Sequence, residues 1–311
     1  MVGWHLLLLL VVEMALYGAI GRHMHVARGW SAGQAIALAA GIYLGVRVVL
    51  VAAEFIVARW NGSPIPDSLR VSFPRLIWMY LRELAGWLLM FTFVMPFVPA
   101  RRSVIDRPAG GDASRPPVLL VHGLACNRGN WFWFRQQLER LGHQVYSMDY
   151  TPPVSRIARY APQLARAVDA IVASTGATTV VLIGHSQGGL VIRAYLDQFG
   201  DDKVEQVITL GSPHRGTWLA RLGLGPNVSD LREDSAWIGG LGEREKRLGA
   251  DVYRMFTCIF TYHDNLVSPQ LNAVLPESTA VALSGIGHLS LALSPRVVKH
   301  VASALGTRIE V

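Results

Sequence analysis

The sequence has 311 residues, of which 51% are hydrophobic and 16% are charged. A typical soluble domain has about 25% charged residues, and so apolar a composition excludes a disordered chain. Two cysteines, Cys126 and Cys258, exclude a disulfide-rich miniprotein. The net charge of +7 is spread along the chain with no zinc-finger or RNA-binding signature, so nucleic acid is not an expected partner. Arginines that flank apolar segments instead fit a membrane surface.

Three apolar blocks occupy the first hundred residues: Trp4–Ile20, Ala35–Val57 and Leu76–Phe97. A helix needs about 20 apolar residues to cross a bilayer. The second block is long enough and the first is marginal. The third either crosses, lies in the interface or docks on the folded domain. We therefore expect residues 1–100 to form two or three membrane-anchoring helices, with lipid as a partner.

The ends and the internal charges of these blocks lead to two further expectations. The first block lacks a positive n-region and a small-residue cleavage site, which argues against a cleaved signal peptide. Charges inside an apolar helix are costly unless they face a partner. We therefore expect Glu13 of the first block to pair with Arg47 of the second across a helical hairpin.

A polar linker at residues 101–117 leads to a different pattern, in which short apolar runs alternate with helical periods. Continuous apolar strands alternating with helices are typical of a mostly parallel sheet covered on both faces, which is an α/β domain over 118–311. The expected strands are 118–122, 145–149, 180–183, 204–210, 258–262 and 281–283. The expected helices are 131–141, 161–174, 190–199 and 295–305.

The strongest local signal is Gly184-His185-Ser186-Gln187-Gly188, placed directly after a predicted strand and before a predicted helix. This is the context of a nucleophile elbow, in which a strained turn lifts the serine hydroxyl above the sheet. The sequence therefore predicts Ser186 as a nucleophile.

A serine needs a base to act as a nucleophile, and the base in turn needs a carboxylate that orients it. The chain order serine, acid, histidine at successive strand ends favours His288 as the base and Asp264 as the acid. His122, His214 and His263 compete for the first role, and Asp149 is the alternative for the second.

An oxyanion hole needs two backbone N–H groups that point at the developing negative charge. One belongs to Gln187, which follows the nucleophile. The other is expected from Leu124, in the loop after the first strand of the α/β domain; the alternative is an ordinary apolar residue that covers the sheet edge.

Four motifs together resemble the bacterial triacylglycerol lipases of the α/β-hydrolase fold: Val121-His122-Gly123-Leu124, Gly184–Gly189, Gly211–Gly216 and Gly287-His288-Leu289. The resemblance covers about residues 116–305. It implies the triad Ser186, Asp264 and His288, with Leu124 and Gln187 as oxyanion donors. Some of these lipases hold a structural calcium near the histidine. Residues 289–295 contain no acid, so no metal or other cofactor is expected here.

Residues 213–251 form a long excursion between strands that is rich in Trp and Leu. Hydrolases often carry a cap or lid at this position, although these residues could simply complete the core. Trp131, Trp133 and Trp218 are candidate substrate-binding residues, and the first two could equally be packing residues of a helix.

The expected function is a membrane-anchored serine ester hydrolase, a lipase, carboxylesterase or phospholipase A-type enzyme that works through an acyl-enzyme. The alternatives are an acyltransferase with the same triad and an inactive membrane scaffold. The expected location is a bacterial inner membrane, with the side of the catalytic domain left open. We expect residues 1–100 to deliver this domain to its substrate without taking part in the chemistry.

Overall fold

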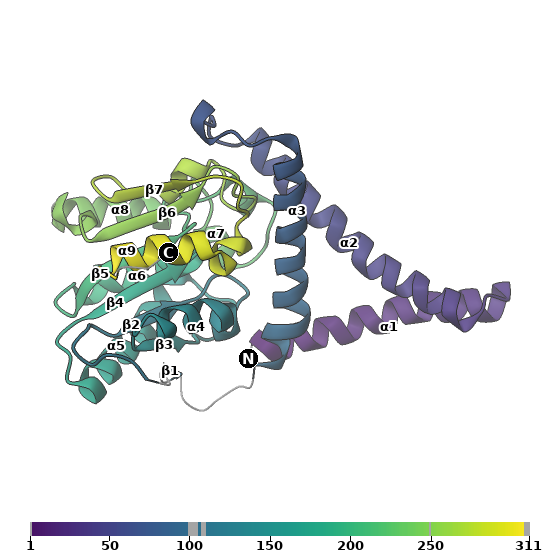
Figure 1. The fold of residues 1–311 in the computed structure, drawn as a ribbon, viewed down its shortest axis with the longest axis horizontal. Coiled ribbons are helices and arrows are strands. Elements are labelled where there is room, and N and C mark those ends of the chain that lie inside the picture. The colour runs from purple at the N-terminus through teal and green to yellow at the C-terminus, as the bar shows by residue number, and fades with distance from the viewer. Residues whose placement is uncertain (1, 99–104, 107–109, 249, 308–311) are drawn as a thin grey trace.

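The computed structural model describes residues 2–98, 105–106, 110–248 and 250–307. It contains an α/β body and, at the N-terminus, a set of long helices that extends from one side of that body (Figure 1). The two parts correspond to the two patterns of the sequence.

The body is built on a seven-stranded sheet in the order β1-β3-β2-β4-β5-β6-β7. Six strands are parallel, and only β1 (Ile105–Asp106) pairs antiparallel, with β3, at one edge. The parallel strands are β2 (Val118–Val121), β3 (Val145–Met148), β4 (Val180–His185), β5 (Val204–Leu210), β6 (Phe256–Thr261) and β7 (Thr279–Leu283). The predicted mostly parallel α/β sheet is confirmed.

Helices cover both faces of the sheet and bury two separate cores. Residues alternate along β2, so that Leu119 and Val121 face one core while Val118 and Leu120 face the other. The first core lies under α5 (Ala161–Thr175) and α6 (Gln187–Phe199), and the second under α4 (Phe132–Arg140) and α9 (Pro295–Ala304). All four lie within a few residues of the predicted ranges. The main difference is that α6 begins at residue 187 rather than 190.

The excursion between β5 and β6 contains η6 (Trp218–Arg221), α7 (Pro226–Asp230), α8 (Ala236–Leu248) and η7 (Ala250–Tyr253). It is tied to the body by Asp230, which accepts hydrogen bonds from Arg156 Nη1 at 2.6 Å and Ile157 N at 2.9 Å. Leu231 and Ile238 join the first core. The excursion thus completes the core and also covers the carboxyl edge of the sheet.

The first two apolar blocks form a helical hairpin, α1 (Val2–Arg28) and α2 (Ala32–Trp60), that projects from the body (Figure 1). Arg47 of α2 pairs with Glu13 of α1, which confirms the predicted contact. The Arg47 guanidinium also lies over the Tyr43 ring, 3.9 Å from its centroid. Both helices are long and apolar enough to cross a membrane.

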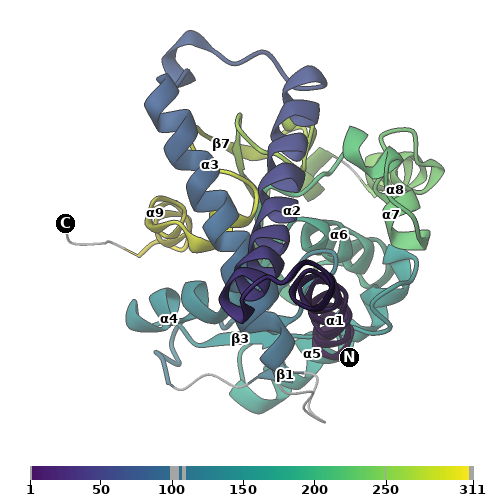
Figure 2. The same ribbon diagram turned by 90° about the vertical axis from the view of Figure 1, so that its right-hand side faces the viewer.

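The third block begins as α3 (Phe73–Leu88), continues as a π-helical segment, η2 (Leu89–Val94), and ends in η3 (Met95–Phe97). Taken together, Phe73–Phe97 also meet the length and hydropathy of a membrane span. In the second view, α2 and α3 run side by side in front of the body and diverge toward the loop that joins them (Figure 2).

The far end of this third segment docks on the body. The Asn127 side chain donates a hydrogen bond to the Met95 carbonyl at 2.9 Å. Met90 and Met95 are buried in a small cluster with Cys126. The C-terminal end of this block thus packs on the folded domain, as one of the alternatives that the sequence leaves open expects.

The predicted linker, residues 101–117, lies partly outside the described residues. Its described part contains β1, which the sequence does not predict, and Asp112 N, which donates to the Gly142 carbonyl at 2.8 Å. The C-terminal part of this segment is therefore packed on the sheet edge.

Candidate active site

Ser186 stands at the turn between β4 and α6, where its backbone adopts φ 54° and ψ −127°. A non-glycine residue at positive φ is strained, and such strain marks functional turns. The turn is possible because Gly188 has no side chain: a Cβ there would lie 2.2 Å from the Val121 carbonyl oxygen. The backbone therefore has the geometry of a nucleophile elbow.

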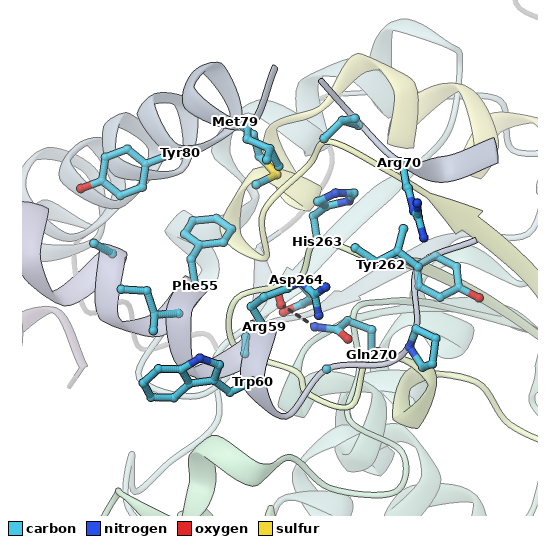
Figure 3. A pocket seen from close by; sticks show the side chains of 18 residues that line it. Phe55, Arg59, Trp60, Arg70, Met79, Tyr80, Tyr262, His263, Asp264 and Gln270 are labelled. Carbon is cyan, nitrogen blue, oxygen red and sulfur yellow. Dashed lines mark hydrogen bonds between the residues drawn. The ribbon is translucent and has the colours of Figure 1, made fainter. Parts of the chain in front are cut away.

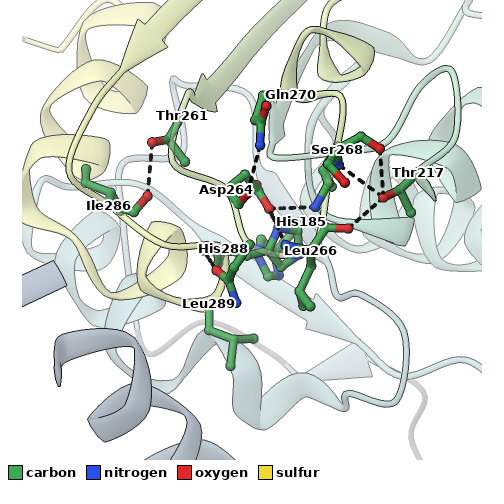
Figure 4. A network of polar contacts seen from close by, with 12 residues as sticks. His185, Thr217, Thr261, Asp264, Leu266, Ser268, Gln270, Ile286, His288 and Leu289 are labelled. Atoms are coloured by element: carbon green, nitrogen blue, oxygen red, sulfur yellow. Dashed lines mark hydrogen bonds and ion pairs between the residues drawn. The ribbon is translucent and has the colours of Figure 1, made fainter. Parts of the chain in front are cut away.

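His288 and Asp264 meet as predicted. The Nδ1 atom of His288 lies 2.9 and 3.0 Å from the two carboxylate oxygens of Asp264 (Figure 4). Asp264 itself is fixed, since its Oδ1 accepts hydrogen bonds from Leu266 N at 2.9 Å and Val267 N at 2.7 Å. This arrangement directs the other ring nitrogen of His288, Nε2, away from the carboxylate and makes it available as a proton acceptor.

The charged groups around His288 favour its protonated form. Burial alone would lower the pKa of His288. The charge and hydrogen bond of Asp264 outweigh that effect, with smaller contributions from Glu83 and Glu54, so the pKa is raised above its ordinary value. The neighbouring His185 is different, because burial and the nearby His288 lower its pKa to about 3 and leave it neutral.

Ser186, His288 and Leu124 all line one pocket of about 320 Å³. Most of its remaining wall is apolar and comes from three parts of the chain. The cap excursion contributes Leu219, Val228 and Leu231, the loop after β6 contributes Leu266 and Val267, and the N-terminal helices contribute Trp87 and Phe91. A reactive serine and histidine in an apolar pocket suit an acyl group bound close to the nucleophile.

Tyr150 links the two segments that contain the predicted oxyanion donors. Its hydroxyl donates to the His122 carbonyl at 2.8 Å, with the Gly123 carbonyl at 3.2 Å, and accepts a hydrogen bond of 3.1 Å from the Gln187 side chain. The first N–H groups of a helix have no acceptor within it, so the Gln187 N–H can serve an oxyanion. The Leu124 N–H belongs to the loop that Tyr150 fixes.

The competing histidines and the competing acid lie elsewhere or have other partners. His214 is buried against Thr209 Oγ1 at 3.1 Å, and His263 accepts from Gly285 N at 3.3 Å. His122 stacks on Tyr150 with 4.2 Å between ring centroids. Asp149 accepts from Arg128 N and Nη1 at 2.7 and 2.9 Å. Asp264 is thus the acid next to His288.

The expectation for three tryptophans needs correction. Trp131 is fully buried in the second core and packs edge-on against Phe134, while Trp133 packs on the same core. Trp218 is half-buried and also lies outside the residues that line the pocket. The aromatic wall is instead formed by Trp87 and Phe91 of the third apolar segment, whose rings stack 4.9 Å apart. The apolar pattern of this segment does not predict that these two rings line the pocket of Ser186.

A larger pocket of about 950 Å³ lies on the other side of Asp264, between α2, α3 and the loop after β6 (Figure 3). Arg59, Arg70 and His263 line it together with apolar side chains of the two helices. Neither Ser186 nor His288 belongs to its wall. The smaller pocket is therefore the candidate active site.

Among the described residues, no group of three or more His, Cys, Asp or Glu side chains is arranged to hold a metal ion. Cys126 and Cys258 are buried and unpaired, and burial raises the pKa of Cys126 to about 12. Ser186, rather than Cys126, is therefore the candidate nucleophile in this pocket.

Comparison with known proteins gives partial matches. Residues 117–237 match the palmitoyl protein thioesterase family. A triacylglycerol lipase of Pseudarthrobacter phenanthrenivorans is 38% identical over 120 residues, which cover 35% of this chain and 36% of the lipase. The human lysosomal thioesterase PPT2 is 32% identical over 141 residues, 43% of this chain and 44% of the thioesterase. The aligned regions thus span less than half the length of these relatives.

Solved structures show the same fold. The mature Bacillus licheniformis lipase BlEst2 superposes with a TM-score of 0.56 at 21% identity, over 65% of this chain and 96% of the lipase. The chain therefore has an α/β-hydrolase fold, preceded by three apolar helices, and resembles bacterial triacylglycerol lipases. These similarities indicate a hydrolase of the lipase, esterase and thioesterase class.

Proposed function

We propose that this α/β-hydrolase is a membrane-anchored serine hydrolase that cleaves acyl esters of lipids. The single observation that carries the proposal is the convergence of Ser186 and the His288–Asp264 pair on one apolar pocket. If Ser186 had only a structural role in the turn after its strand, a hydrogen-bonded histidine and carboxylate at the same pocket would not be required.

The proposed reaction proceeds in two steps. Nε2 of His288 takes the proton of Ser186 Oγ as Oγ attacks the carbonyl carbon, and the N–H groups of Leu124 and Gln187 stabilise the oxyanion. Collapse of this intermediate expels the alcohol, which receives the proton from His288 and leaves an acyl group on Ser186. Water, activated by His288, then releases the acid.

The lipid nature of the substrate rests on where the pocket lies. Its wall includes Trp87 and Phe91, which belong to a segment that is apolar and long enough to cross a membrane. Leu8, Leu9 and Val49 are among many apolar side chains exposed on α1 and α2, as expected for helices that face lipid. An acyl chain held in a bilayer would therefore lie close to the pocket.

A thioester is a second candidate substrate. It is favoured by the match of residues 117–237 to the palmitoyl protein thioesterase family. The same serine chemistry cleaves either bond, because collapse of the tetrahedral intermediate expels the alcohol or the thiol and leaves the same acyl-enzyme on Ser186. The choice therefore concerns the leaving group and not the catalytic residues.

The test uses the full-length protein in detergent or nanodiscs. We expect Ser186 to be labelled by a fluorophosphonate and the wild type to hydrolyse p-nitrophenyl esters. Ser186→Ala should lose at least about a thousandfold in kcat while it keeps its circular dichroism spectrum. Parallel assays with an acyl ester and the matched acyl thioester decide the leaving group. Ser186→Ala activity within tenfold of wild type would overturn the proposal.

A further inference from the structure

The catalytic histidine is followed directly by a turn whose N–H groups are bound by a carboxylate of the third apolar helix. Glu83 of α3 is 1% exposed, and its two oxygens accept hydrogen bonds from Leu289 N at 2.7 Å and Ser290 N at 3.0 Å. These are the first two residues of η9 (Leu289–Leu293). The first N–H groups of a helical turn lack internal acceptors, so Glu83 satisfies groups that would otherwise be buried and unpaired.

The residue before the histidine is shaped to admit this carboxylate. A Cβ on Gly287 would lie 2.4 Å from Glu83 Oε2 and 2.5 Å from its carboxyl carbon. Real side chains do not approach so closely, so position 287 is restricted to glycine as long as Glu83 occupies its place. Glu83 therefore contacts the chain on both sides of His288.

A second carboxylate reaches the same residue from α2. The Asn265 side chain donates to Glu54 Oε2 at 2.8 Å and accepts from His288 N at 2.9 Å. Glu54 also lines the catalytic pocket. The carbonyl of His288 accepts from His185 Nε2 at 3.1 Å. The backbone N–H and carbonyl of His288 and the N–H groups of Leu289 and Ser290 are thus all hydrogen-bonded.

Carboxylates are expensive inside apolar helices unless they are fully hydrogen-bonded. Two such residues, on two different helices, converge on the backbone around His288 through hydrogen bonds to Asn265 and Leu289, which are separated from them by 211 and 206 residues in sequence. We propose that Glu83, and Glu54 acting through Asn265, are positioning residues for His288, so that α2 and α3 are parts of the active site. The inference rests on the proposed function, in which His288 is the base.

The mechanism of positioning is geometric. Asp264 sets the rotation of the imidazole ring, but the distance of the ring from Ser186 depends on where the backbone of His288 lies. A shift of about 1 Å in a catalytic group is enough to cost about a hundredfold in rate. Loss of Glu83 should therefore reduce kcat, while KM, which depends on the apolar wall, changes little.

The main test is Glu83→Gln in the full-length protein. Glutamine keeps the shape but places an NH₂ group against one of the two N–H donors. We expect kcat for p-nitrophenyl butyrate to fall at least about tenfold with KM within about twofold, and labelling of Ser186 by a fluorophosphonate to slow in parallel. The matched controls are Arg82→Gln, on the exposed side of the same helix, and Glu13→Gln, whose carboxylate pairs with Arg47. Both should stay within about twofold of wild type.

A double variant separates positioning from general support of the fold. If Glu83 acts through His288, Glu83→Gln should reduce the residual rate of His288→Ala no further. An additional tenfold loss in that background would overturn the proposal, as would a wild-type kcat for Glu83→Gln. If the wild type itself neither hydrolyses esters nor reacts with the fluorophosphonate, the proposed function fails instead.

Glu54 supplies a second and independent test should Glu83→Gln not fold. Glu54→Gln keeps an oxygen that can accept from Asn265, whereas Glu54→Leu removes it and leaves similar volume. We expect Glu54→Gln to retain kcat within about threefold and Glu54→Leu to lose at least about tenfold. Equal kcat values for the two variants would contradict the positioning role.

Discussion

The side-chain amide of Gln187 donates a 3.1 Å hydrogen bond to the hydroxyl of Tyr150, which in turn donates to the carbonyl of His122. Tyr150 therefore connects the helix that begins after the nucleophile to the loop that contains Leu124. We expect this link to hold the loop of Leu124 near Gln187, the two residues predicted to form the oxyanion hole.

Tyr150→Phe should accordingly reduce kcat by about tenfold to a hundredfold with a smaller change in KM, since oxyanion stabilisation acts in the transition state. Steady-state kinetics with a p-nitrophenyl ester measures both. Tyr160→Phe is the matched control, because it removes a hydroxyl that donates to the Pro152 carbonyl, away from the oxyanion loop. If both variants lose activity equally, the role of Tyr150 in the oxyanion hole is refuted.

Replacement of each candidate acid, Asp264 or Asp149, by asparagine gives a second prediction. Asp264→Asn should lower kcat by several orders of magnitude, because an amide cannot hold the tautomer and charge of His288. Asp149→Asn should be much milder, since Asp149 binds Arg128 and not His288. The two purified variants are compared by kcat. A reversed ranking would move the acid to the end of β3.

His288→Ala and His214→Ala form a similar pair. The first should be nearly as inactive as Ser186→Ala, since, of the two histidines among the described residues that line the pocket, His288 is the one paired with a carboxylate. His214→Ala should keep most activity, because His214 is buried against Thr209 and lies outside the pocket of Ser186. The same ester assay, with a melting temperature for each variant, decides. A dead but folded His214→Ala would identify a different base.

The pH profile follows from the raised pKa of His288. His288 must be neutral to accept a proton, so kcat/KM should fall as the pH drops through a pKa above the ordinary value of about 6.5. The groups that face His288 are Asp264, Glu83, Glu54 and the neutral His185. Profiles of kcat/KM between about pH 5 and about pH 9 locate this limb. A limb well below pH 6.5 would contradict the electrostatic arrangement described.

Acyl-chain selectivity should depend on the aromatic wall. Phe91 is one of the residues that line the pocket of Ser186. If long acyl chains extend to this ring and short ones do not, Phe91→Ala should raise KM for a long-chain p-nitrophenyl ester by about tenfold and leave a short-chain ester nearly unchanged. Phe93→Ala removes the same group two residues away, where the ring is 66% exposed, and should affect neither substrate. An equal loss for both esters would place Phe91 outside the acyl site.

The sequence predicts the body of the protein well because its signals are local. A continuous apolar strand followed by Gly-x-Ser-x-Gly and a helix identifies Ser186, and the order of strand ends selects Asp264 and His288. The prediction for Trp131 was wrong because the local sequence does not show which way a side chain points. A tryptophan after the oxyanion loop has the same sequence context whether its ring enters the pocket or the core.

Glu83 and Glu54 show what the sequence does not contain. Both stand out as charges inside apolar blocks, which indicates that each has a partner. The partners lie more than 200 residues away, and no periodicity relates them. The positioning role proposed for Glu83 and Glu54 departs from the expectation that residues 1–100 serve only for delivery, because two of the three helices contact the loops that carry His288 and Asp264.

The site is assembled from opposite ends of the chain, and this has a consequence for biosynthesis. On the ribosome, α1, α2 and α3 emerge before Ser186, and β7, η9 and α9 emerge after it. A growing chain therefore carries its nucleophile for about a hundred residues of synthesis without the base. The base docks against helices that have already been made, so a polypeptide without these helices would finish synthesis with its histidine loop unsupported. On the proposed mechanism, hydrolysis would therefore begin only after the loop of His288 has folded against the N-terminal helices.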